Sequence, residues 1–245
     1  MKRETQNILL VLLGGALLKI ALNGTYLRYV KPGQQAWLIA AGGVMVILAF
    51  VSITRDIIAA RRPEQVVAEV PDHGHSHGGF QSHSTWLLIL PVLAVFLAPP
   101  ALGEDAVNRA AGRTPPPPSS SDEFSFPALP AGDPIDQRVM DFVERAAWDK
   151  SGSLNDRNVR LTGFIVHNEN STYLARLAIG CCAADAYPVK VKLDNPEAKG
   201  FVSDTWVQAV VRYQPGSSTK ESRHVPTVTL TDIQSIPEPP DPYEY

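Results

Sequence analysis

The pattern of hydrophobic positions divides the chain into an apolar N-terminal third and a more polar remainder. Two long apolar runs lie near the start, over residues 8–26 and 36–53. Each approaches the ~20 residues that a helix needs to cross a hydrocarbon core about 30 Å thick. Lys19 interrupts the first run, whereas the second run carries no charged residue. The pattern therefore predicts a transmembrane hairpin over residues 1–62.

A third apolar run covers residues 86–102 and contains Pro91, Pro99 and Pro100. Proline is tolerated in a membrane helix where neighbouring groups satisfy the freed backbone carbonyl. The run predicts a third transmembrane helix over residues 85–103. The alternative is a re-entrant or interfacial segment, so the N-terminal region has two to three membrane helices.

The positive-inside tendency predicts the orientation of these helices. One side of the membrane receives five basic residues, and the other side receives four. With three spans, the N-terminus and the 54–85 loop lie in the cytoplasm, and the C-terminal domain is extracytoplasmic. If the third run does not cross, the C-terminal domain is cytoplasmic. Both cases describe a multi-pass protein of the plasma membrane that contacts lipid. The five basic residues are Lys2, Arg3, Arg55, Arg61 and Arg62, and the four are Arg28, Lys31, Arg109 and Arg113.

Residues 104–132 form a Pro-rich segment that includes four consecutive prolines at 115–118. Proline at this density favours an extended, semi-rigid spacer without a hydrophobic core. We therefore expect a linker here. Phe124 and Phe126 are able to dock on the following domain, but the composition favours a tether.

The pattern changes at Asp133 to one that predicts a folded domain over residues 133–245. Asp133 is a good N-cap and Pro134 suits the first helical position. Apolar residues then recur at helical spacing, which predicts a helix that ends near Trp148.

Short segments rich in β-branched and aromatic residues follow this helix. Five strands in so short a domain indicate a small, partly open barrel of OB type with one N-terminal helix. An SH3-like barrel and an open α+β sheet are the alternatives. The predicted strands are Val159–His167, Tyr173–Ile179, Tyr187–Leu193, Thr205–Tyr213 and Thr227–Ile236.

Charge and motif content argue against two classes of function. From Asp133 onward there are twelve Lys and Arg against sixteen Asp and Glu. A nucleic-acid binder needs a basic face to neutralise phosphates, so we expect no nucleic-acid partner. The chain also lacks a Gly-rich phosphate loop, a GxSxG elbow and an HExxH motif, and we therefore expect no enzymatic activity.

The only two cysteines, Cys181 and Cys182, are adjacent and lie between the second and third predicted strands. With Asp185 they place two sulfur ligands and a carboxylate within five positions, which suits Zn²⁺ or another divalent transition metal. A fourth ligand from the chain would be His167 or His224. The alternatives are cysteines that only fill space in the core and a reactive thiol pair.

A second candidate for metal binding is the predicted loop at residues 63–84. Four of the six histidines alternate there with Gly and Ser, namely His73, His75, His77 and His83. Such a tract binds divalent transition metals weakly, because a flexible loop does not hold its ligands in place. A polar loop with incidental histidines is the alternative.

Several of these features together resemble the YcgQ-like bacterial membrane proteins. The resemblance rests on Cys181-Cys182-Ala183-Ala184-Asp185, on the preceding residues 175–179 (ARLAI) and on the closing residues 239–243 (PPDPY). This uncharacterised family has no established biochemical activity. The resemblance implies a multi-span permease as partner, since members are typically encoded beside one.

Three functions are therefore considered from the sequence. The first is a membrane-anchored accessory subunit of a multi-span permease that takes part in divalent metal handling. The second is a membrane-tethered, OB-like binding module without a transport role. The third is a thiol redox protein.

Overall fold

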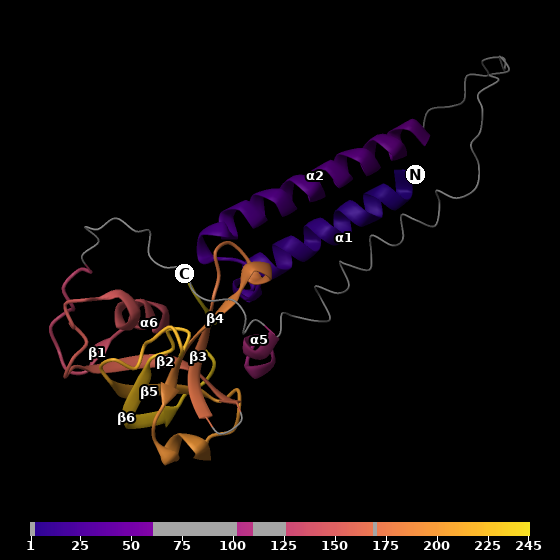
Figure 1. Ribbon diagram of the computed structural model, residues 1–245. Coiled ribbons are helices and arrows are strands. Elements are labelled where there is room, and N and C mark those ends of the chain that lie inside the picture. The colour runs from indigo at the N-terminus through magenta and orange to yellow at the C-terminus, as the bar shows by residue number, and fades with distance from the viewer. Residues whose placement is uncertain (1–2, 61–101, 110–125, 169–170) are drawn as a thin grey trace. The chain divides into compact units, whose positions relative to one another are not determined.

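The computed structural model describes residues 3–60, 102–109, 126–168 and 171–245, and these form two compact units (Figure 1). The described residues up to position 60, apart from Leu27–Lys31, make the first unit. Leu27–Lys31 and the described residues from Leu102 onward make the second. The short connection between the first two helices therefore belongs structurally to the C-terminal unit.

Two long helices, α1 (Arg3–Leu22) and α2 (Gln35–Ala60), lie side by side in the first unit (Figure 1). Glycines allow their close approach, because a Cβ atom at Gly42 would lie only 2.9 Å from the Gly14 carbonyl oxygen. Small residues at such a crossing are typical of membrane helix pairs. Two 3-10 turns, η1 (Thr25–Arg28) and η2 (Pro32–Gln34), lie between the helices.

One helix of the described region is long and apolar enough to cross a membrane. It spans Pro32–Ala59; its most apolar stretch of 18 residues has a mean hydropathy of 2.4, and little of that stretch is buried within the protein. The apolar part of α1, Gln6–Leu22, is shorter. The third predicted span lies almost entirely outside the described residues.

The second unit contains the five predicted strands and two further strands of two residues each. The five long strands start and end within two residues of the predicted bounds. β1 and β7 were missed because two residues are too short for a periodic pattern. The strands are β1 (Ile135–Asp136), β2 (Asn158–Asn168), β3 (Ser171–Ala178), β4 (Tyr187–Leu193), β5 (Trp206–Tyr213), β6 (Thr227–Ser235) and β7 (Tyr243–Glu244).

The strands form one sheet in the order β1-β2-β5-β6-β4-β3-β7, with an additional pairing of β2 with β3. β4 and β6 are parallel, whereas β2–β3, β3–β4, β2–β5 and β5–β6 are antiparallel. Each of the five long strands therefore pairs with two other long strands. The connections carry the 3-10 turns η4 (Ala183–Asp185) and η5 (Pro196–Gly200).

The helix predicted to start at Pro134 begins later, as α6 (Val139–Trp148). Ile135 and Asp136 instead form β1, which pairs in parallel with β2, and Ile135 is buried. Arg138 occupies the N-cap position but provides no side-chain cap. The Glu244 carboxylate accepts hydrogen bonds from the first two helical N–H groups, those of Val139 (2.9 Å) and Met140 (2.7 Å). The helix start is therefore set by a residue that lies about a hundred positions away.

Apolar side chains of the second unit form two clusters. The larger cluster packs α6 against the interior of the sheet, and its members include Phe142, Leu161, Val191 and Val211. The smaller cluster covers the opposite face of β2 and β3, with Phe164, Leu177 and Trp206. Both faces of the central part of β2 are therefore buried, which explains its continuous apolar run.

The segment predicted as a linker is folded at both of its described ends. Residues 104–109 form α5 (Glu104–Arg109), and Val107 is fully buried in the smaller cluster. At the other end, the Arg145 guanidinium lies 4.9 Å from the Phe126 ring centroid and donates to the Pro127 carbonyl. The prediction of a tether is wrong at these positions. The density of proline residues predicts an extended chain, but it does not predict which apolar residues beside the prolines pack on the folded domain.

Candidate metal centre

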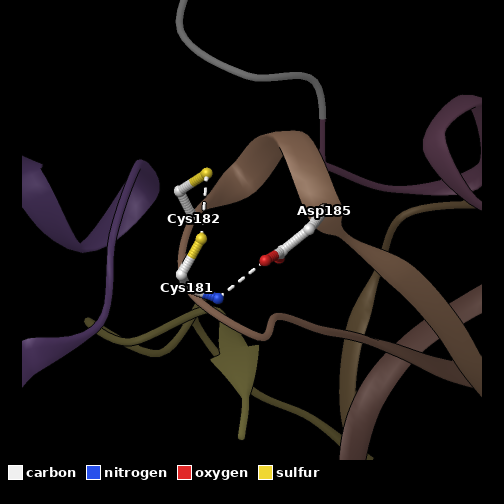
Figure 2. A group of neighbouring side chains, drawn as sticks. All are labelled: Cys181, Cys182 and Asp185. Carbon is white, nitrogen blue, oxygen red and sulfur yellow. Dashed lines mark hydrogen bonds between the residues drawn. The ribbon is translucent and has the colours of Figure 1, made fainter.

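Cys181, Cys182 and Asp185 lie together on the short loop that connects β3 to β4 (Figure 2). One ligand atom from each residue lies within 4.8 Å of the other two. Cys181 is exposed and Cys182 is half-buried, and both are free thiols. The loop therefore presents two sulfurs and a carboxylate at an accessible surface.

The separation of the two sulfurs suits a shared metal ion. The Cys181 and Cys182 Sγ atoms are 3.7 Å apart, although neighbouring side chains of a strand point to opposite faces. Two thiolates on a tetrahedral zinc ion, each about 2.3 Å from the metal, stand about 3.8 Å apart. The loop brings the adjacent sulfurs to the spacing that such an ion requires.

The Asp185 carboxylate also holds the loop in shape. Its Oδ1 accepts from the Gly180 N–H at 2.9 Å, and its Oδ2 accepts from the Cys181 N–H at 2.7 Å. Each carboxylate oxygen has two lone pairs, so both oxygens retain the capacity to bind a cation. Gly180 suits this arrangement because a Cβ there would lie 3.0 Å from Asp185 Oδ2.

The ionisation of these groups reflects their closeness. Desolvation raises the pKa of Asp185, but hydrogen bonds from Cys181 and Gly180 outweigh it, so that its pKa is lowered and the carboxylate is charged. The hydrogen bond to Asp185, the neighbouring Cys182 and the negative charge nearby raise the pKa of Cys181 to about 11. Without a cation, the Cys181 thiol therefore stays protonated at neutral pH. A bound metal would supply the positive charge that this cluster lacks.

The loop that carries Cys181, Cys182 and Asp185 (the Cys loop) is hydrogen-bonded to residues 27–31, which lie in the connector between α1 and α2. Cys182 forms an antiparallel β-bridge with Val30, and the Ala183 N–H donates to the Tyr29 carbonyl at 2.8 Å. Val30 thus pairs with the loop through one isolated bridge, and Tyr29 adds a second backbone hydrogen bond beside the site. The sequence carried no signal for this contact, because the connector is too short and irregular for a strand pattern.

The C-terminal segment packs against the same region. β7 pairs in parallel with the end of β3, immediately before the Cys loop. The Tyr243 hydroxyl donates to the Arg28 carbonyl at 3.2 Å, and the buried Arg176 guanidinium donates to the carbonyls of Asp241 and Tyr243. The segments that carry the family resemblance therefore lie together in space.

The predicted histidine ligands are not part of this cluster. His167 bonds Thr172 Oγ1 through Nδ1 and the Phe201 carbonyl through Nε2. The His224 ring stacks on Trp148, with a centroid distance of 4.8 Å. Within the described ranges, the grouped metal-ligand residues are Cys181, Cys182 and Asp185 alone. The tract with His73, His75, His77 and His83 lies outside the described residues.

These observations define a class of protein: an N-terminal helical pair with one membrane-length helix, and a mostly β unit that exposes a Cys-Cys-Asp cluster. Residues 5–109 match the DUF1980 N-terminal domain, and residues 139–245 match the DUF1980 C-terminal domain. The chain therefore carries both domains of the DUF1980 family. No curated protein and no solved structure shows significant similarity to it.

The structural units do not follow the two family domains. Residues 27–31 and α5 fall within the N-terminal domain match, but both pack in the second structural unit. The C-terminal domain therefore buries part of its surface against segments that the N-terminal domain contributes.

Proposed function

We propose that this protein is a membrane-anchored accessory subunit of a multi-span permease and takes part in handling a divalent metal. The observation that carries the metal part is the clustering of Cys181, Cys182 and Asp185 with a sulfur separation of 3.7 Å. The permease part rests on the resemblance to YcgQ-like proteins. We expect the protein to act by binding and not by catalysis.

The number of ligands grouped among the described residues favours a transfer site over a purely structural one. Structural zinc sites are closed by four protein ligands, whereas sites that exchange a ligand keep one position open. Cys181, Cys182 and Asp185 supply three ligands at an accessible loop. A donor or acceptor group of the permease would complete the coordination of Zn²⁺ or a similar cation while the metal passes between the two proteins.

The packing of the connector residues Leu27–Lys31 against the β sheet supports a multi-pass arrangement with three membrane crossings. Leu27–Lys31 packs in the same unit as the β sheet, so this connector and the sheet share one side of the membrane. If α2 crosses the bilayer after the connector, the chain must cross again before it reaches α5. The apolar segment at residues 85–103 is the part of the chain suited to that return, and the charge bias of five basic residues against four favours a position of the mostly β second unit (the β unit) outside the cytoplasm.

This arrangement separates the two candidate metal sites. The tract with His73, His75, His77 and His83 falls between the second and third crossings, on the side opposite the Cys loop. The two ligand sets would then act on different faces of the membrane. Such a division suits a protein that assists movement of a cation from one side to the other.

Labelling of single cysteines with a membrane-impermeant maleimide tests the three-crossing topology. The reporters are Gly33→Cys, Ser76→Cys and Lys199→Cys, each placed in the Cys181→Ser/Cys182→Ser background. In intact cells we expect labelling at positions 33 and 199, and labelling at position 76 only after permeabilisation. Labelling at 76 and 199 from the same side would contradict a third crossing.

Affinity purification in a mild detergent tests the association with a permease. A tag at the cytoplasmic N-terminus avoids the packed C-terminal segment, where Glu244 and Tyr243 are buried. We expect a multi-span protein to co-purify in a defined ratio and to be lost at high detergent concentration. Recovery of the chain without such a partner would favour the tethered binding module.

The second candidate function is that tethered module, and the strand pairing favours it. The five long strands pair as β2-β5-β6-β4-β3, and β3 returns to β2. This circuit, with a parallel β4–β6 pair, supports an OB-like barrel, a fold that often binds ligands across one face. The redox function has less support, because a thiol with a pKa of about 11 supplies little thiolate at neutral pH.

A further inference from the structure

A basic cleft of about 480 Å³ lies between β4 and the loop before β6, apart from the Cys loop. Its lining includes Tyr173, Lys190, Lys192, Arg223 and His224, and we call it the basic cleft. Its volume falls within the ~300–1,000 Å³ of small-molecule sites. The metal-site proposal uses none of these residues.

Two lysines of β4 form one wall. Lys190 and Lys192 are two positions apart, so both side chains leave the same outer face of the strand. Tyr173 on β3 is the register partner of Lys192, and the Lys190 ammonium lies 4.5 Å from the Tyr173 ring centroid. The wall is therefore an ordered surface with an aromatic base and two positive charges.

The loop before β6 forms the other wall and adopts a costly backbone conformation. Arg223 and His224 both have positive φ, at 52° and 59°. A non-glycine residue in this region costs on the order of 1 kcal/mol or more, and such residues are common at ligand sites. Hydrogen bonds from the His224 N–H to the Thr219 carbonyl and from Ser218 to the His224 carbonyl hold the turn.

The charge of the basic cleft is unusual for this part of the chain. From Asp133 onward acidic residues outnumber basic ones, sixteen to twelve. Among the described residues that line the cleft this balance is reversed, since three are Lys or Arg and Glu221 is the one acidic residue. Among the ion pairs of the described residues, none includes Lys190 or Lys192.

Two polar groups of the basic cleft are partly or wholly withdrawn from water. Desolvation and the nearby charge of Arg223 lower the pKa of Lys190. His224 Nδ1 is buried and makes no hydrogen bond to the described residues. An anion between the two walls would offset the repulsion between Lys190 and Arg223.

We propose that the basic cleft binds the phosphate group of a small anionic ligand, either a soluble phosphate ester or the headgroup of an anionic lipid. Two lysines and an arginine around one cavity match the charge of a phosphate. The excess of acidic over basic residues from Asp133 onward disfavours a long polyanion, because its further phosphates would be repelled by a net negative unit. The proposal stands independently of the metal site.

Binding to full-length protein in nanodiscs tests this proposal. The two probes are glycerol 3-phosphate, titrated in phosphatidylcholine nanodiscs, and phosphatidylglycerol, measured as lipid retained per chain after extraction. We expect the Lys190→Gln/Lys192→Gln variant to lose at least about tenfold in affinity or retention, since two charge-assisted contacts are removed. Trp148 stacks on His224 and gives a fluorescence signal for the soluble probe.

The control variant is Lys150→Gln/Lys199→Gln, which makes the same change in net charge at exposed lysines outside the cleft. Binding of glycerol 3-phosphate that depends on Lys190 and Lys192 identifies a soluble ester, and phosphatidylglycerol retention that depends on them identifies a lipid headgroup. If both variants behave alike with both probes, the proposal is wrong. The single variant Lys192→Gln changes only an exposed side chain, so a loss of binding in this variant is not caused by a loss of folding.

Discussion

Replacing both cysteines by serine is expected to abolish tight zinc binding. Cys181 and Cys182 are the only cysteines, and their sulfurs are 3.7 Å apart. A serine hydroxyl stays protonated at neutral pH and is a poor ligand for zinc, so the variant loses two of three ligands. The loss should exceed the ~10–100-fold decrease that follows removal of a supporting hydrogen bond at a metal site. Equilibrium dialysis of the full-length protein in detergent measures it.

Cobalt substitution identifies the ligands in the same experiment. A thiolate-to-cobalt charge-transfer band in the wild-type protein can arise only from Cys181 or Cys182, because the chain has no other cysteine. The matched control replaces His73, His75, His77 and His83 with serine. That control should keep the tight site and lose only weaker binding. Unchanged zinc affinity in the cysteine variant would exclude the Cys loop as the metal site.

The Asp185→Asn variant separates the two roles of this side chain. Asparagine keeps one oxygen for the backbone N–H of Gly180 or Cys181, but it carries no charge. If the carboxylate is a ligand, zinc affinity falls while the thermal unfolding midpoint changes little. A large fall in the midpoint would instead assign Asp185 a mainly structural role.

The Glu244→Gln variant is expected to destabilise the β unit by about 3–5 kcal/mol, the usual cost of leaving one charge of a buried pair uncompensated. Glu244 is 5% exposed, accepts from the first two N–H groups of α6, and lies 3.8 Å from the buried Arg176. Glutamine removes the charge, and its amide group would place a donor against a backbone donor. Thermal unfolding of the full-length protein measures the loss.

Glu238→Gln is the matched control on the same C-terminal segment. Glu238 pairs with Arg28 at 2.8 Å, but both side chains are 36% exposed. Exposed pairs contribute about 0–1 kcal/mol, so this variant should be close to the wild type. The double variant Arg176→Met/Glu244→Gln should lose less than the sum of the single changes, because it removes both buried charges. Equal losses for the two glutamate variants would contradict the role assigned to Glu244.

Local sequence patterns predicted the repeating elements of the fold well. The alternation of Val189, Val191 and Leu193 with Lys190 and Lys192 predicted β4, and the structure buries the three apolar residues. The start of α6 was predicted five residues too early, because Asp133 and Pro134 resemble a helix start. The true start depends on pairing of β1 with β2 and on the cap from Glu244.

The geometry of the candidate site was also not predicted in full, because it too depends on contacts between residues that are distant in the sequence. Residue types identified Cys181, Cys182 and Asp185, but they did not reveal that the adjacent sulfurs face the same side. They also suggested His167 as a ligand, although both of its ring nitrogens bond elsewhere. Side-chain direction in a loop depends on the hydrogen bonds that shape it, and here those bonds include a bridge to Val30.

The sequence by itself determined the apolar helical region, the five long strands and the Cys-Cys-Asp loop. Each of these depends on neighbouring residues, through the periodicity of side chains along a helix or strand. Only the tertiary structure decided that residues 27–31, α5 and the C-terminal segment meet around the β unit. Such contacts join residues as far apart as Arg28 and Tyr243, and local periodicity carries no information about them.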